Sequence, residues 1–173
     1  MNNLNLKNLK KVYIFFTLLA IISFIMGCIL NIKIENKPDF NPNLIDIIKN
    51  NMYVFFFVII ISMLTVGVYA IVYTTTEFFY LGVLISQLYK EKGIVYSLSF
   101  IFPHGILEIP EMILAPSFGV FLLLNIVCYF RRKSIIDLYF IRKIIIVGVV
   151  MILLSGLIEV FITPNILKYI LKF

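Results

Sequence analysis

Residues 12–30 read VYIFFTLLAIISFIMGCIL, a run of 19 residues without one charged side chain. A helix of about 20 apolar residues is long enough to cross the hydrocarbon core of a bilayer. The whole chain has the same character, because 62% of its 173 residues are hydrophobic and only 14% are charged, against about 25% charged in soluble domains. So few charged side chains cannot cover a soluble core. A soluble enzyme is therefore excluded, and an integral membrane protein is predicted.

Basic residues set the predicted orientation. Lys7, Lys10 and Lys11 precede the first span, and residues 131–143 hold five basic side chains against one Asp. Short loops rich in Lys and Arg stay in the cytoplasm. The N-terminus and the 131–143 loop are therefore predicted inside, and the C-terminus outside. Because the basic residues lie in short clusters between apolar runs, binding to nucleic acid is not predicted.

The predicted fold is an all-α integral membrane protein, a single domain over residues 1–173, with about five transmembrane helices and one broken or re-entrant helical segment. A polar outer loop is expected at 31–52, where Pro38 and Pro42 disfavour a helix. The spans are expected at about 12–30, 53–73, 94–109 or 77–89, 112–130 and 144–162.

Two signals set expected helix ends. Thr74-Thr75-Thr76-Glu77 is typical of an N-cap, so a new helix is predicted to begin there with Glu77 near the inner face. Thr163-Pro164-Asn165 is expected to end the last span.

The middle of the chain fits two registers. In one, residues 77–89 cross the membrane and 94–130 form a single crossing with a large irregular part. In the other, 77–89 is a short re-entrant or interfacial helix, 94–109 runs outward and 112–130 returns. The charges favour the second register, because it keeps the lysines of segment 90–92 inside.

Several polar residues interrupt the otherwise apolar segment 101–111. It contains the only histidine of the chain, two carboxylates, a glycine and two prolines that are expected to break the helix. Ionisable side chains at membrane depth are costly, so they usually face a bundle interior, a cavity or each other. Helical spacing places the histidine and both carboxylates on nearly one face. One polar cluster towards the outer leaflet is predicted, formed by His104, Glu108, Glu111 and Glu159.

Three interpretations of this cluster stay open. The structural one, which is favoured, is that Glu108 accepts hydrogen bonds from backbone groups freed by the prolines, while His104 caps or orients Glu108 and Glu159 ties the last helix to the site. The second is a pathway for a peptide, a proton or a cation. The third is metal-assisted hydrolysis, which the absence of a His-Glu-x-x-His motif and of a second histidine disfavours. No metal, cofactor or catalytic residue is predicted, and the candidate serines Ser97, Ser99 and Ser117 lack a Gly-x-Ser-x-Gly setting.

Two motifs carry a resemblance. Pro103-His104-Gly105-Ile106-Leu107-Glu108 resembles the Pro-His-Gly-x-x-Glu-Leu signature of the stage II sporulation protein M family. The segment 156–164 is similar to the last-helix pattern of that family, an aliphatic-Glu-aromatic sequence that ends in Thr-Pro. Tyr80-Leu81-Gly82 falls where the family has an Asn-Gly-x-x-Gly turn, although Phe79-Tyr80 replaces Asn-Gly here. The candidate functional residues are Pro103, His104, Gly105, Glu108, Glu111 and Glu159, with Glu77, Gly82, Pro110 and Pro164 in support.

The resemblance implies a non-catalytic, multi-pass member of a complex in the bacterial cytoplasmic membrane. One branch of the family implies a scaffold that recruits peptidoglycan-remodelling partners in sporulation. The other implies small proteins that serve circular-bacteriocin maturation, export or self-immunity, and the short chain and small outer loop favour it. The expected partners are the lipid bilayer, transporter or maturation proteins or cell-wall hydrolases, and a hydrophobic cationic peptide. A metal-dependent intramembrane peptidase or cyclase is the third alternative, and an oligomer is left open.

Overall fold

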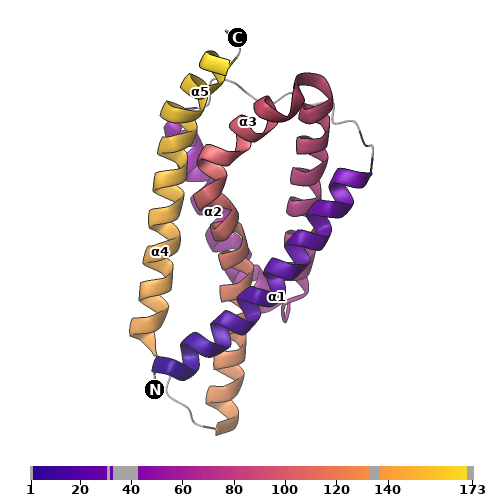
Figure 1. Cartoon of the computed structure of the whole chain (residues 1–173). Helices are drawn as coiled ribbons and strands as arrows, with labels where there is room; N and C mark the ends of the chain where they lie inside the picture. The colour runs from indigo at the N-terminus through magenta and orange to yellow at the C-terminus, as the bar shows by residue number, and fades with distance from the viewer. Residues whose placement is uncertain (1, 31, 33–42, 133–136, 171–173) are drawn as a thin grey trace.

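The computed structural model describes residues 2–30, 32, 43–132 and 137–170, and for residues 2–6, 104 and 132 it describes the backbone only. All regular elements in these ranges are helical, and Figure 1 shows them as one elongated bundle. They are α1 (Asn2–Ile29), α2 (Leu44–Leu64), α3 (Val68–Arg132), α4 (Leu138–Leu157), the π-helix η1 (Ile158–Ile162) and α5 (Thr163–Ile170).

Five stretches of these helices are long and apolar enough to cross a membrane. They are Lys7–Ile29, Leu44–Leu64, Val68–Pro103, Gly105–Arg131 and Leu138–Ile170. The predicted all-α membrane fold with about five spans is therefore confirmed. The start of α1 and the end of α5 lie at opposite ends of the bundle, and α3 ends and α4 begins at the end where α1 starts (Figure 1).

The longest element, α3, consists of two helices joined at Gly93. Gly93 has φ 81° and ψ 173°, outside the helical region, and a positive φ is a conformation that glycine adopts at little cost. Figure 1 shows α3 rising to one end of the bundle and then returning. Leu88 and Tyr96, on either side of the reversal, pack against Leu167 of α5. The reversal therefore lies at the end of the bundle that carries α5.

The favoured register of the middle segment is wrong. Residues 94–132 form one continuous helix, so the predicted outward run over 94–109 and return over 112–130 do not occur. The lysines of segment 90–92 lie at the reversal, near α5 and away from the start of α1. The chain follows the other register, in which 77–89 belongs to a crossing, but the large irregular part expected within 94–130 is wrong because 94–132 is helical throughout.

The predicted breaks at Pro103 and Pro110 are also wrong, because both lie inside the second half of α3, as does Pro116. Each proline removes one backbone donor, and a membrane helix tolerates this where neighbouring groups satisfy the freed carbonyls. A chain reversal needs a larger change of backbone conformation, which Gly93 supplies.

The second span begins and ends earlier than predicted. The Asn43 side chain accepts a hydrogen bond of 3.1 Å from the Ile45 backbone N–H and so caps α2. Residues 44–52, expected in the outer loop 31–52, are therefore helical, whereas 31 and 33–42 lie outside the described residues. The helix ends at Leu64, and the positive φ values of Val66 (54°) and Gly67 (84°) form the turn into α3. The predicted span 53–73 is wrong because this turn divides one continuous apolar run between two helices.

The expected N-cap at residues 74–77 lies inside α3, which begins at Val68. The Thr76 hydroxyl is 2.9 Å from the Val72 carbonyl oxygen and 3.1 Å from that of Tyr73, so it bonds to its own helix rather than capping a new one. Helical threonines commonly make this bond.

The last span is longer than predicted at both ends. Asp137 caps α4 by accepting a hydrogen bond of 3.0 Å from the Phe140 N–H, so residues 138–143 of the predicted loop are helical. Residues 133–136 lie outside the described part. At the other end the chain stays helical through η1 and α5 to Ile170, so Pro164 does not end the helix.

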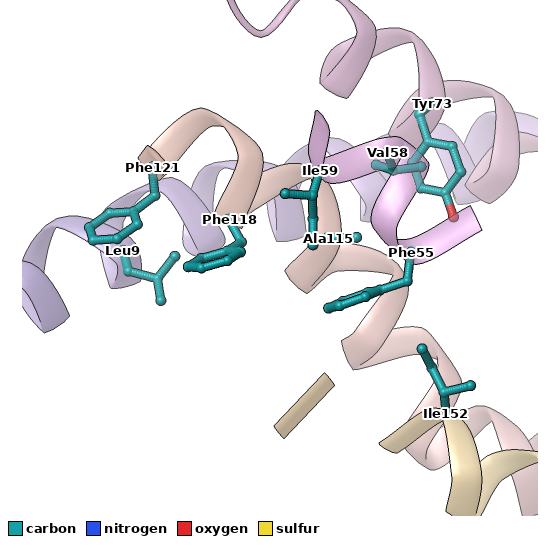
Figure 2. Packing of buried hydrophobic residues seen from close by; sticks show 9 residues of the cluster. All are labelled: Leu9, Phe55, Val58, Ile59, Tyr73, Ala115, Phe118, Phe121 and Ile152. Carbon is teal, nitrogen blue, oxygen red and sulfur yellow. The ribbon is translucent and has the colours of Figure 1, made fainter. Parts of the chain in front are cut away.

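The main apolar core joins α1, α2, both halves of α3, and α4 (Figure 2). Two glycines allow this packing: a Cβ on Gly119 would lie 2.6 Å from the Ile59 carbonyl oxygen of α2, and a Cβ on Gly148 would overlap the Phe55 ring. Small residues at such positions let membrane helices approach closely. The core cluster consists of Leu9, Phe55, Val58, Ile59, Tyr73, Ala115, Phe118, Phe121 and Ile152.

Candidate functional site

Four glutamates from three helical segments form one connected cluster, which we call the carboxyl cluster: Glu77, Glu108, Glu111 and Glu159. Glu108 interacts electrostatically with both Glu159 and Glu77, and Glu111 interacts with Glu108. Glu111 is buried, with 6% of its surface exposed, and the other three are half-buried. Glu108, in the second half of α3, thus interacts with one glutamate of the first half of α3 and with one of η1.

The structure brings three of the four residues of the predicted cluster together, namely Glu108, Glu111 and Glu159. The backbone of His104 is helical, and its side chain lies outside the described part of the chain. Glu77 was expected near the inner face, as part of a helix start. It lies instead within the first half of α3 and interacts with Glu108.

Tyr73 is a member of this site that the sequence did not single out. Its side chain is 8% exposed and interacts electrostatically with Glu77, Glu108 and Glu111. The same ring belongs to the apolar core, and Figure 2 shows it beside Val58. The one sequence signal for it is the i, i+4 spacing from Glu77, which places both side chains on one helix face.

Local contacts position the two glutamates of the second half of α3. They lie on either side of Pro110, whose carbonyl oxygen accepts a hydrogen bond of 3.4 Å from the Tyr13 hydroxyl of α1. This bond ties α1 to the helix that carries Glu108 and Glu111. Pro103 and Gly105 lie in the same helix, and a Cβ added to Gly105 would meet only the Ile101 and Ile109 side chains, at 3.4 Å.

Glu159 lies in the π-helix η1, whose bonds span five residues. The Thr163 backbone N–H donates to the Ile158 carbonyl, and the Thr163 hydroxyl also lies 3.3 Å from that oxygen. The next residue, Pro164, has no N–H, so the regular i→i−4 pattern cannot continue through it. A π-turn accommodates this gap, and such turns are frequent at functional sites.

Gly82 supports the site from a distance, where α1 crosses the first half of α3. A Cβ on Gly82 would overlap the Phe24 carbonyl oxygen of α1. The backbone contact, rather than a turn, accounts for the glycine at this position.

A surface pocket leads to the carboxyl cluster at Glu77. It has a volume of about 470 Å³ and is lined by Thr76, Glu77, Phe79 and Tyr80. Glu77 therefore borders this pocket and also interacts with Glu108.

The described residues include no group of three His, Cys, Asp or Glu side chains placed to hold a metal ion. Two of the three candidate serines bond to their own helix: the Ser97 hydroxyl lies 2.8 Å from the Gly93 carbonyl oxygen and that of Ser117 lies 2.6 Å from the Ile113 carbonyl oxygen. The arrangement of the described residues can bind cations or hydrogen-bond donors at carboxyl groups, and the Ser97 and Ser117 hydroxyls bond to backbone carbonyls rather than to a base.

Comparison with protein families matches residues 12–164 to the family described as stage II sporulation protein M. No curated protein and no solved structure matches the chain. The family match extends over both motif segments and over all members of the carboxyl cluster.

Proposed function

The chain belongs to the stage II sporulation protein M family, and we propose that it is a non-catalytic subunit of a membrane complex that handles a hydrophobic, cationic peptide. The process we propose is the maturation, export or self-immunity of a circular bacteriocin. The observation that supports this proposal is the meeting of four carboxyl groups from three helical segments within a multi-pass helical protein.

Charge is the first argument for a cationic ligand. Carboxyl groups gathered at membrane depth repel each other and lose hydration, and an incoming ammonium or guanidinium group offsets both costs. The buried Glu111 and its neighbour Glu108 are placed to supply this complementarity. The apolar remainder of such a peptide would replace lipid at the helix surfaces.

The pocket at Glu77 is the second argument, because it combines a carboxyl group with the aromatic rings of Phe79 and Tyr80. An aromatic face attracts cations, and a neighbouring carboxylate adds a charged acceptor. A lysine or arginine side chain that enters here would meet the carboxyl group of Glu77, which interacts with Glu108.

A second candidate function is a membrane scaffold for peptidoglycan-remodelling partners in sporulation. The observation that favours it is the extent of the family match, which covers residues 12–164. Under this function the carboxyl cluster would stabilise the arrangement of α3 and η1, and partners would dock on other surfaces.

The test is affinity purification of the tagged protein from its own membrane, with mass spectrometry of the proteins and peptides that co-purify. Glu108→Gln and Glu159→Gln are compared with Glu91→Gln, a matched control outside the carboxyl cluster whose carboxylate accepts a hydrogen bond of 3.0 Å from Gln87. We expect the wild type and the control to retain a small hydrophobic peptide or a transporter subunit. Both cluster variants should insert normally but lose that ligand by about tenfold or more.

Other outcomes discriminate between the functions. Cell-wall hydrolases that co-purify equally with all variants would support the scaffold. A stoichiometric metal ion that is lost on His104→Ala, measured by elemental analysis of the same sample, would contradict a non-catalytic role.

A further inference from the structure

An apolar groove of about 570 Å³ opens between α1 and the two halves of α3, and we call it the lateral groove. Its floor includes the buried Ala20, Phe78 and Ile101, and its rim includes the exposed Ile21 and Leu98. A buried floor and an exposed rim describe a groove that opens to the surroundings of the protein.

The lateral groove follows from the reversal of α3. The two halves of α3 diverge from Gly93, and α1 lies obliquely across them (Figure 1). The α1 helix meets the first half by backbone contact at Gly82 and the second half through the hydrogen bond from Tyr13 to Pro110. Between these two contacts the helices separate, so the space between them is not filled by side chains of the described residues.

The chemistry of the lining restricts what can fill this space. Among the described lining residues the one polar side chain is that of Thr17, whose hydroxyl donates to the Tyr13 carbonyl at 2.8 Å. The groove therefore offers dispersion contacts rather than hydrogen bonds. An unfilled groove would lack those contacts. In a bilayer, the apolar group that can fill the groove is a lipid acyl chain.

Positive charge lies at the end of the groove where α3 reverses. Ile85 lines the groove, and Lys92 follows it by seven residues, which places it on the same helix face about 10 Å along the axis, whereas Lys90 lies on another face. Lys90 and Lys92 are both exposed. The Lys92 ammonium lies 3.1 Å from the Tyr96 hydroxyl and 4.3 Å from the centre of that ring. The Glu91 carboxylate in the same turn is engaged by Gln87.

An apolar groove with lysines at its end complements a molecule that has an acyl chain and an anionic headgroup. We propose that the lateral groove binds one acyl chain of an anionic glycerophospholipid, whose phosphate is held by Lys92. The lipid belongs to the leaflet on the side of α5. This site is separate from the carboxyl cluster, so it stands whether or not the peptide-handling function does.

The experiment uses the full chain in nanodiscs of phosphatidylcholine that contain a small fraction of a photoactivatable probe. The probe carries a diazirine on its acyl chain and has either a phosphatidylglycerol or a phosphatidylcholine headgroup. After irradiation, the labelled peptides are mapped by mass spectrometry. We expect the phosphatidylglycerol probe to label peptides that line the groove, such as those containing Ile21 and Leu98.

Two pairs of variants make the test specific. Ile21→Trp fills the groove and should lower its labelling several-fold, whereas Ile22→Trp should not, because Ile22 is similarly exposed (57% against 50%) but does not line the groove. Lys92→Gln should lower labelling by the phosphatidylglycerol probe about fivefold, the effect of one basic residue at an anionic headgroup. Lys168→Gln, an exposed lysine in α5 near the same end of the bundle, should leave it unchanged.

The proposal is overturned if labelling spreads equally over the exposed faces of α1 and α4, or if Ile21→Trp and Ile22→Trp behave alike. It is overturned as well if both headgroups label the groove equally, since Lys92 would then select no headgroup. If labelling of the groove falls only as the protein dimerises, a second copy of the chain displaces the probe. That result would assign the groove to an oligomer interface instead.

Discussion

Gly27 of α1 and Gly82 of α3 face each other where these two helices cross, and each occupies a position that has no room for a side chain. A Cβ on Gly27 would overlap the Phe79 carbonyl oxygen, and a Cβ on Gly82 would overlap the Phe24 carbonyl oxygen. In addition, the Cys28 thiol lies 3.5 Å from the Gly82 carbonyl oxygen. Backbone therefore packs directly on backbone at this crossing, as it does at small-residue contacts between membrane helices.

We predict that Gly82→Ala destabilises the protein by about 1–3 kcal/mol, the usual cost of inserting a methyl group into a packed contact. Thermal unfolding in mild detergent measures the change. Gly105→Ala is the control, because its Cβ would make only ordinary contacts at 3.4 Å with Ile101 and Ile109. Equal unfolding temperatures for the two variants would contradict the crossing described here.

The two roles of Tyr73 can be separated by substitution. Tyr73→Phe keeps the ring in the apolar core, so stability should change by no more than about 1 kcal/mol. It removes the hydroxyl of a side chain that interacts electrostatically with Glu77, Glu108 and Glu111, so binding of the co-purifying peptide should weaken. Tyr73→Ala removes the ring as well and should cost about 3–5 kcal/mol. Unfolding and co-purification are measured on the same samples, and full peptide binding by Tyr73→Phe would place the hydroxyl outside the site.

Two buried hydroxyl groups, those of Ser62 and Thr74, have no hydrogen-bond partner among the described residues. An unsatisfied buried polar group carries a desolvation cost of about 1–3 kcal/mol. Ser62→Ala and Thr74→Val are therefore predicted to leave stability unchanged or to raise it.

Ser97→Ala is the matched control for these two variants. Ser97 is equally buried, but its hydroxyl donates to the Gly93 carbonyl at the reversal. Its loss should lower the unfolding temperature. Destabilisation by all three substitutions to the same degree would show that Ser62 and Thr74 do have partners.

The reversal at Gly93 also gives a prediction about topology. Cysteines introduced at Lys92 and at Lys168 should react with a membrane-impermeant maleimide from the same side of the membrane, and a cysteine at Lys10 from the opposite side. The native Cys28 and Cys128 are replaced by serine beforehand. If the Lys92 and Lys10 cysteines react from one side, the chain follows the register favoured by its charges rather than the one described here.

The number of spans could be predicted from the sequence because the apolar runs are long and nearly free of charge. The C-terminal end of α2 could not be predicted. Residues 53–73 form one apolar run, and the turn at Val66 and Gly67 carries no polar signal. The reversal of α3 was missed for a related reason. Two prolines, Pro103 and Pro110, are expected to break the helix and a single glycine is not, whereas a proline removes one donor and a glycine can reverse the chain.

The candidate site could be predicted in part. Glutamates in apolar segments stand out because placing a carboxyl group in the membrane costs free energy. Glu108, Glu111 and Glu159 lie together in the structure. Glu77 looked like part of a helix start because three threonines precede it. Tyr73 is one of ten tyrosines, and only the packing of α3 against itself and against α2 distinguishes it.

The central claim is that Glu108 in α3 and Glu159 in η1 belong to one site, and cross-linking tests it most directly. In a chain whose native cysteines are replaced by serine, Glu108→Cys and Glu159→Cys are combined and treated in membranes with a short bifunctional thiol reagent. The control pair is Glu108→Cys with Lys143→Cys, which lies about 24 Å from Glu159 along the last helix. The account predicts rapid cross-linking of the first pair and little of the second. Equal or slower cross-linking of the first pair would contradict it.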